Sequence, residues 1–297
     1  MAKKKTARHA KRKTAHRTKR AARRKAKLPQ LRVEQETPYP VRNFNGDVLT
    51  GVLHEPLQES KTLVIAVHGF LGSKNQGILR QACIELARAG YSAYRFDLSG
   101  NGDSEGRFED ATPSKMLRDI SAVIEHFRSR YAKLILLGHS LGGALTIVAA
   151  SRAKVDGVIA LAAPMHHEHF NALLSPAQRE QLVSVGFTII MAKRSVGDVP
   201  YTITERFFSE LRELQPLAAA KEVHCHVLVA YGTADTRVPP SDSQELIAAL
   251  FSKDLFLIGG ADHNITNPIH ADAFIAAVVA WLGKHDGRKP ARKKSIR

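Results

Sequence analysis

The sequence predicts an α/β fold in which a mostly parallel sheet is covered by helices on both faces. Short apolar runs of strand length alternate along the chain with longer segments whose apolar residues recur at helical spacing. Parallel strands are buried on both faces and are joined by helices, so both patterns follow from this architecture. With 297 residues, of which 44% are hydrophobic, the chain can form one large domain of this kind.

The predicted elements define a domain over residues 40–284. Prolines before it, such as Pro38, indicate a linker. Gly90 follows the first helical segment and is a typical helix stop. Strands are expected at residues 47–53, 62–67, 92–96, 134–137, 157–161, 227–230 and 255–258, and helices at residues 75–89, 113–130, 141–152 and 268–282.

The alternation of strands and helices stops over residues 165–222. This stretch is rich in apolar and aromatic residues and is long for a connection within a compact domain. We interpret it as a short helical lid inserted over the edge of the sheet where the strands end. The alternative is a pair of ordinary peripheral helices that gate nothing.

The net charge of +16 belongs to the two ends of the chain. Residues 1–27 hold 14 Lys and Arg and no acid, and residues 287–297 hold 6 more, again without an acid. The residues between them carry 24 basic and 28 acidic side chains. The sequence therefore predicts a mildly acidic domain between a disordered basic tail at residues 1–30 and a second basic tail at residues 285–297.

The basic residues 1–27 allow several functions. A run of cations can bind nucleic acid without sequence specificity, by releasing counterions from the phosphates. It can also be a solubilising tail without a partner. A membrane surface is less favoured, because no leucine or aromatic face accompanies the charge. A hydrolase domain tethered to nucleic acid remains an alternative function for the whole chain.

Targeting and cofactor motifs are not evident. No apolar run approaches the ~18 residues of a membrane span, and no apolar segment follows the basic N-terminus as in a secretory signal. The two cysteines, Cys83 and Cys225, do not form a disulfide framework and fit a reducing compartment. We therefore expect a cytoplasmic protein. No glycine-rich nucleotide-binding motif is suitably placed, so no cofactor is expected.

A candidate nucleophile lies in Gly138-His139-Ser140-Leu141-Gly142. A buried strand is predicted before this motif and a helix after it, which is the context of a nucleophile elbow. Gly138 and Gly142 leave room for the sharp turn that exposes the Ser140 hydroxyl. The alternative is a plain glycine-rich turn between a strand and a helix.

A serine hydroxyl needs a base, and the sequence offers one with an acid to orient it. Asp235 follows one late strand and His263 follows the last strand, so both are expected at the edge of the sheet where Ser140 lies. His263 would accept the serine proton, and Asp235 would hold its tautomer. Alternatively Asp235 caps a turn and His263 is a polar loop residue. Asp262, although adjacent to His263, is not chosen as the acid.

Two backbone N–H groups are expected to stabilise the oxyanion. One belongs to Leu141, the residue after the nucleophile. The other is expected from His68-Gly69-Phe70 at the end of an early strand, with the Phe70 N–H as the donor. Gly69 would let the loop approach closely, and His68 would orient it.

Three neighbouring histidines, His166, His167 and His169, suggest a metal site at first sight. Nearby acids and cysteines do not complete a ligand set, and the proposed triad needs no metal. We therefore expect no bound metal and interpret these residues as histidines of the lid surface or the pocket wall.

Taken together, these motifs resemble those of α/β-hydrolases. The set includes His68-Gly69-Phe70, the glycine-rich turn at residues 97–104, residues 138–143, residues 232–239 and Ala261-Asp262-His263. The similarity covers residues 40–284 and is closest to the group of serine aminopeptidase-like hydrolases, monoacylglycerol lipases and cinnamoyl (feruloyl) esterases. The basic tails have no counterpart in that pattern.

The resemblance implies a triad of Ser140, Asp235 and His263, with Phe70 and Leu141 as oxyanion donors, and gives the turn at residues 97–104 a structural role. It implies cleavage of a carboxylic ester, with an acyl or aryl group, through an acyl-enzyme. Amide hydrolysis by an aminopeptidase-like enzyme and a monoacylglycerol lipase activity are the alternatives.

Overall fold

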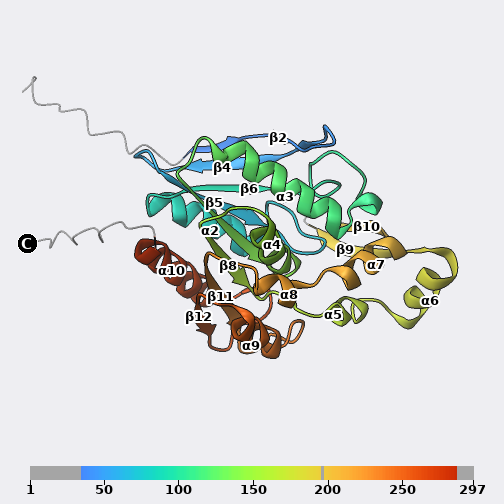
Figure 1. Cartoon of the computed structure of the whole chain (residues 1–297). Coiled ribbons are helices and arrows are strands. Elements are labelled where there is room, and N and C mark those ends of the chain that lie inside the picture. Colours follow the sequence, from blue (N-terminus) through green and yellow to red (C-terminus); the bar gives the residue numbers. More distant parts are fainter. Residues whose placement is uncertain (1–34, 195–196, 286–297) are drawn as a thin grey trace, which may run out of the picture. The chain divides into compact units, whose positions relative to one another are not determined.

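The computed structural model describes residues 35–194 and 197–285. Its centre is an eight-stranded sheet with the strand order β1-β4-β6-β5-β7-β8-β11-β12 (Figure 1). The pairs β1–β4 and β4–β6 are antiparallel, and every other neighbouring pair is parallel. The predicted α/β architecture with a mostly parallel sheet is therefore confirmed. The strands are β1 (Gln35–Pro38), β4 (Gly51–Glu55), β5 (Thr62–Val67), β6 (Ser92–Phe96), β7 (Lys133–His139), β8 (Gly157–Leu161), β11 (His226–Gly232) and β12 (Lys253–Ile258).

The N-terminal part of the sheet differs from the prediction in two ways. β1 (Gln35–Pro38) lies before residue 40, in the segment interpreted as a linker, and pairs with β4 at the sheet edge. The strand expected at residues 47–53 is divided at Thr50, between β3 (Val48–Leu49), which pairs with β2 (Val41–Arg42), and β4. The Thr50 N–H donates to Ser104 Oγ, and the Thr50 carbonyl accepts the Asp97 N–H. The backbone of Thr50 is therefore hydrogen-bonded to the turn that follows β6 and not to a neighbouring strand.

Helices cover both faces of the sheet, and β5 shows why. Its residues are all buried: Leu63, Ile65 and Val67 belong to one apolar core, while Val64 and Ala66 belong to the core on the opposite face. α2 (Gly77–Arg88) and α10 (Pro268–His285) cover the second of these cores. The first is covered by α3 (Pro113–Arg128), α4 (Leu141–Arg152) and α9 (Pro240–Ala249).

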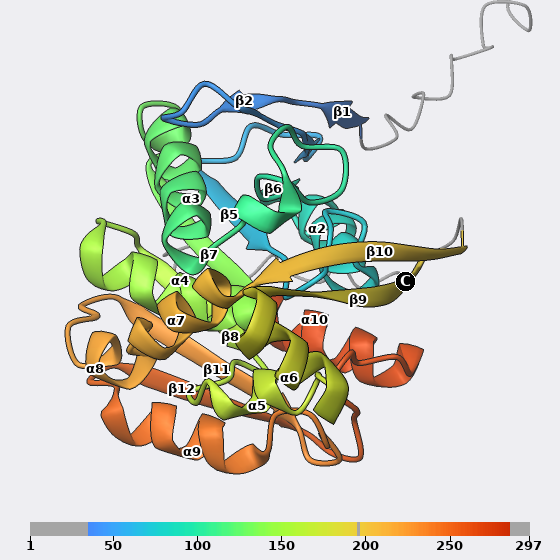
Figure 2. The same ribbon diagram turned by 90° about the vertical axis from the view of Figure 1, so that its right-hand side faces the viewer.

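Residues 165–222, called the insertion from here on, connect β8 to β11. They form α5 (Glu168–Asn171), α6 (Pro176–Val185), the antiparallel hairpin β9 (Phe187–Arg194)–β10 (Gly197–Thr204), α7 (Glu205–Glu213) and α8 (Pro216–Ala220). Figures 1 and 2 show α5, α6, α7 and the hairpin gathered at one end of the molecule. The insertion was expected to be a short helical lid, and besides its helices it contains this hairpin, because β-branched and aromatic residues at 187–190 favour a strand.

Two further observations bear on the sequence analysis. No helix in the described part of the chain is long and apolar enough to cross a membrane. The basic residues 1–30 and all of the second tail beyond His285 lie outside the described residues, so the structure does not test their predicted disorder or nucleic-acid binding.

Candidate active site

Ser140 lies in a strained turn between β7 and α4. Its backbone has φ 55° and ψ −127°, a region that side chains with a Cβ atom rarely adopt, and its N–H donates to the Leu161 carbonyl oxygen at 2.9 Å. A Cβ atom on Gly138 would lie 2.2 Å from the Gly142 oxygen, and one on Gly142 would lie 2.3 Å from the Val67 oxygen. Both positions therefore require glycine, which agrees with the predicted elbow.

The structure brings the three residues of the predicted triad together. His263 Nε2 lies 3.0 Å from Ser140 Oγ, and His263 Nδ1 lies 2.7 Å from Asp235 Oδ2. The other oxygen of Asp235, Oδ1, accepts the backbone N–H groups of Arg237 at 2.9 Å and Val238 at 3.0 Å. The rotamer of this carboxylate is therefore fixed, and only Oδ2 is left for the imidazole.

The electrostatics of this arrangement favour an ionised carboxylate. Burial by itself would raise the pKa of Asp235, but the hydrogen bonds from His263 and from two backbone N–H groups outweigh it and lower the pKa. Asp262, in contrast, accepts hydrogen bonds from the N–H and hydroxyl of Thr266. It does not contact His263 through its carboxylate, in line with its rejection as the acid.

Two N–H groups of the segments next to Ser140 have no acceptor in the described part of the protein. They belong to Phe70, in the loop after β5, and to Leu141, the first residue of α4. A Cβ atom on Gly69 would lie 3.0 Å from Ser140 Cβ, so this loop and the elbow are in close approach. Unsatisfied N–H groups beside a nucleophile are the expected form of an oxyanion hole.

A partly buried chain of hydrogen bonds, which was not predicted from the sequence, connects the loops that carry Gly69 and His263. His139 Nε2 lies 2.8 Å from the His263 carbonyl oxygen, and His139 Nδ1 lies 2.5 Å from Gln76 Nε2. Gln76 Oε1 in turn accepts the Gly69 N–H at 3.3 Å. Burial, and then the neighbouring His263, lower the pKa of His139 to about 4, so it is neutral. It donates from Nε2 and accepts at Nδ1, and thereby positions His263.

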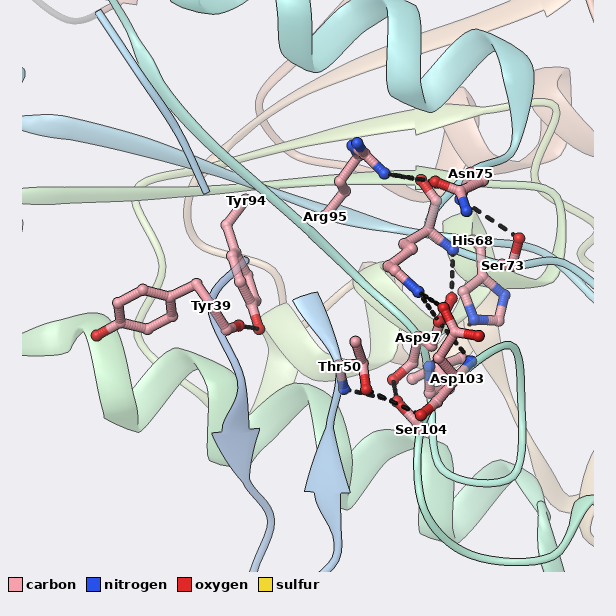
Figure 3. A network of polar contacts seen from close by, with 12 residues as sticks. Tyr39, Thr50, His68, Ser73, Asn75, Tyr94, Arg95, Asp97, Asp103 and Ser104 are labelled. Atoms are coloured by element: carbon pink, nitrogen blue, oxygen red, sulfur yellow. Dashed lines mark hydrogen bonds and ion pairs between the residues drawn. The ribbon is translucent and has the colours of Figure 1, made fainter. Parts of the chain in front are cut away.

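The loop after β5 is also hydrogen-bonded to the turn that follows β6 (Figure 3). His68 Nε2 accepts the Leu98 N–H at 3.1 Å, as its predicted orienting role requires. Lys74 Nζ donates to Asp97 Oδ2 at 2.6 Å and to Asp103 Oδ2 at 2.5 Å. Burial would lower the pKa of Lys74, but these hydrogen bonds outweigh it and raise the pKa. The glycine-rich turn therefore stabilises the loop electrostatically.

Ser140 and His263 open into a cavity of about 980 Å³. One part of its wall is apolar and comes mainly from the insertion and the loop after β5. This part includes Phe70, Phe170, Leu173, Ile190, Met191 and Val238. The charged residue Arg237 also lines the cavity. Another part of the wall is polar and comes from α2, the loop before it and the loop after β12. It includes Ser73, Asn75, Gln76, Gln81, Asn264 and Thr266.

Aromatic contacts link the insertion to the candidate oxyanion loop. The ring of Phe70 lies 5.0 Å from that of Phe207 and 5.7 Å from that of Phe170, measured between centroids. Both partners are buried residues of the insertion. A shift of the insertion would therefore act on the residue whose N–H is the candidate oxyanion donor.

The histidines at 166–169 do not share a metal site among the described residues. His169 Nε2 lies 3.0 and 3.1 Å from the two carboxylate oxygens of Asp242, and His166 Nε2 lies 3.0 Å from Glu245 Oε2. Asp242 and Glu245 belong to α9, so these contacts attach the start of the insertion to the main domain. His169 also lines the cavity.

Known proteins resemble this chain in sequence and in structure. A sequence model described as Serine aminopeptidase, S33, matches residues 58–192. The mitochondrial palmitoyl-protein thioesterase ABHD10 of Pongo abelii is 28% identical over 221 residues, which cover 72% of this chain and 70% of that protein.

Solved structures share the fold over most of the chain. The ferulic acid complex of Est1E from Butyrivibrio proteoclasticus superposes with a TM-score of 0.68 at 21% identity and covers 84% of this chain and 100% of that one. The mouse α/β-hydrolase domain-containing protein 10 superposes with a TM-score of 0.66 at 22% identity and covers 84% of this chain and 99% of that one. The chain therefore has the α/β-hydrolase fold, and over residues 58–192 it resembles the serine aminopeptidase (S33) family.

Proposed function

We propose that the protein is a serine hydrolase that cleaves carboxylic esters through an acyl-enzyme formed on Ser140. The observation that carries this proposal is the unbroken series of contacts from Ser140 Oγ through His263 to Asp235, at 3.0 and 2.7 Å, with Ser140 and His263 on the wall of the cavity. A hydroxyl hydrogen-bonded to an oriented imidazole is the arrangement that activates serine as a nucleophile.

In the proposed reaction His263 accepts the Ser140 proton as the hydroxyl attacks the ester carbonyl. The N–H groups of Phe70 and Leu141 bind the oxygen that becomes negative. His263 then protonates the leaving alcohol, and a water molecule activated by the same imidazole releases the acid. Asp235 stays ionised throughout and stabilises the imidazolium, a role supported by its lowered pKa.

The chemistry of the cavity wall supports a substrate with two unlike parts. The apolar part, with Phe170, Ile190 and Met191, suits an alkyl or aryl group. The polar part, with Gln81, Asn264 and others, suits a hydroxylated or amide-bearing group, and Arg237 adds a cationic side chain to the cavity lining. We propose that the acyl chain lies along the insertion and the leaving group along the polar wall.

A long-chain acyl thioester is a second candidate substrate. The apolar wall from the insertion favours it, and the sequence relatives at 25–28% identity include several named palmitoyl-protein thioesterases. The same triad cleaves either bond, because a thiolate is also an adequate leaving group. The cytoplasmic location stays a prediction, and the names of those relatives place them in mitochondria.

A substrate panel tests the proposal. p-Nitrophenyl esters of increasing chain length, hydroxycinnamate esters, acyl thioesters and aminoacyl p-nitroanilides are compared for the wild type and for Ser140→Ala. We expect turnover of esters or thioesters that is lost in the variant. Turnover of the anilides alone would replace the proposal with aminopeptidase-like amide hydrolysis. Full activity in Ser140→Ala would exclude the mechanism.

A further inference from the structure

A cluster of three potential metal ligands lies at the end of the sheet away from Ser140. His226 is the first residue of β11, Asp254 is the second residue of β12, and His285 is the last described residue of α10. Ser140 follows the carboxyl end of β7, so in this parallel part of the sheet the cluster lies near the opposite edge. It takes no part in the proposed hydrolysis.

The geometry points to a divalent metal site, and we propose that His226, Asp254 and His285 bind a Zn²⁺-like ion. The two imidazole rings are stacked, with centroids 4.0 Å apart and planes 27° apart, and both direct Nε2 at one carboxylate oxygen. Asp254 Oδ2 lies 2.8 Å from His226 Nε2 and 3.1 Å from His285 Nε2. All three ligand atoms lie within 4.8 Å of one another.

These separations are close to those that zinc requires. With Zn–N and Zn–O bonds of about 2.1 Å, the ligand atoms of a tetrahedral site lie about 3.4 Å apart. The two N–O separations of 2.8 and 3.1 Å need only small outward movements of the side chains. Two imidazoles and one carboxylate are ligands that zinc prefers, with water as the fourth.

The surroundings of the three residues fit the same site. Ser252 Oγ lies within hydrogen-bond distance of His226 Nδ1, so it can accept the Nδ1 proton when Nε2 holds a metal.

Lys284 is the group that opposes metal binding. Its Nζ lies 3.2 Å from Asp254 Oδ1, and its side chain is 63% exposed, so it can move into solvent. In the absence of metal, this ammonium and the two imidazoles share one carboxylate. A metal ion would replace the protons on both Nε2 atoms and displace the lysine from Asp254.

The single tryptophan of the chain can report on this site alone. Trp281 is buried, its ring centroid lies 4.9 Å from that of His285, and it belongs to the same helix. Ions bound by distant histidines would not affect its fluorescence in this way. The experiment titrates the full chain with Co²⁺, which quenches a nearby indole, and then displaces the Co²⁺ with Zn²⁺.

We expect saturable quenching that Zn²⁺ reverses. Asp254→Asn and His285→Gln should each weaken binding more than tenfold, since even the loss of a partner behind a ligand costs about 10- to 100-fold. Lys284→Gln should strengthen it about two- to fivefold, by removing a competing exposed ion pair. His166→Gln, at a histidine paired with Glu245 far along the chain, serves as the matched control and should leave it unchanged.

Asp254→Asn should weaken metal binding and Lys284→Gln should strengthen it, although both changes act at the same carboxylate. These opposite effects on the affinity keep the test decisive. Thermal unfolding of each variant without metal checks that it is folded. Quenching that is equal in the wild type, Asp254→Asn and His285→Gln would place the ion elsewhere and overturn the proposal. No quenching at millimolar Co²⁺ would also overturn it and leave the cluster a purely electrostatic contact.

Discussion

Replacing Asp235 by Asn should reverse the tautomer of His263 and thereby remove the base. Asp235 Oδ1 accepts two backbone N–H groups, from Arg237 and Val238. An asparagine must keep its carbonyl oxygen there, which places its NH₂ group where Oδ2 now meets His263 Nδ1. Nδ1 then becomes an acceptor, and the ring proton moves to Nε2. That proton faces Ser140 Oγ, so the imidazole can no longer accept the serine proton.

The size of the expected fall in kcat follows from the loss of general-base catalysis in a site that is otherwise intact. We expect kcat to fall about 10⁴-fold, equivalent to about 5.4 kcal/mol of transition-state stabilisation. KM should change little, because Asp235 does not line the cavity. The assay is steady-state hydrolysis of the best p-nitrophenyl ester, with the melting temperature of the variant measured alongside.

Asp262→Asn provides the matched control one residue from His263. Its carboxylate binds Thr266 and not the imidazole, so kcat should stay within about threefold of the wild type. An Asp235→Asn enzyme with kcat within tenfold of the wild type would refute the role given to this carboxylate. So would a larger loss in Asp262→Asn than in Asp235→Asn.

Three further predictions follow from the same geometry. Gly69→Ala should lower kcat about tenfold or more, because a Cβ atom would lie 3.0 Å from Ser140 Cβ, whereas Gly259→Ala, with nothing within 4 Å, should not. Burial lowers the pKa of His139 from 6.5 to about 4, so the unfolded state binds its proton more readily between these values and stability falls as the pH drops from 6.5 towards 4. From pH 7 to pH 5 the free energy of unfolding of the wild type should fall by about 2 kcal/mol more than that of His139→Gln, as measured by urea denaturation. Equal losses in the two proteins would contradict this. Met191→Ala should lower kcat/KM about three- to tenfold for long-chain esters but not for acetyl esters, and equal effects would exclude the insertion as the acyl site.

The fold could be predicted from the sequence because its signals are local. Uninterrupted apolar runs, such as the one in β5, are typical of strands buried on both faces, and helical spacing in α2 marks a helix on that sheet. The hairpin β9–β10 was missed because most of its residues are exposed or only half-buried, and because Gly197 and Pro200 interrupt the strand pattern of β10. α9 was missed because only a few residues, among them Leu246, are buried, which leaves a weak apolar pattern.

The candidate site also contains residues that could be predicted from the sequence and residues that could not. Ser140, Asp235 and His263 occupy turns at strand ends that the motifs identify, and the structure brings them within hydrogen-bond distance. Gln76 and Lys74 could not be found, because their roles depend on contacts with residues 63 and 23 positions away. Such contacts leave no periodic signal in a single sequence.

The formation of a covalent acyl-enzyme on Ser140 tests the central claim most directly. The full chain is mixed with a slowly hydrolysed ester, quenched in acid during the pre-steady-state burst, digested and analysed by mass spectrometry. We expect one acyl group on the peptide that contains Ser140, formed at the rate of the burst and absent from the Ser140→Ala protein. Ester turnover by a wild-type enzyme that never carries this group, or an acyl group on another residue with the same kinetics, would contradict it.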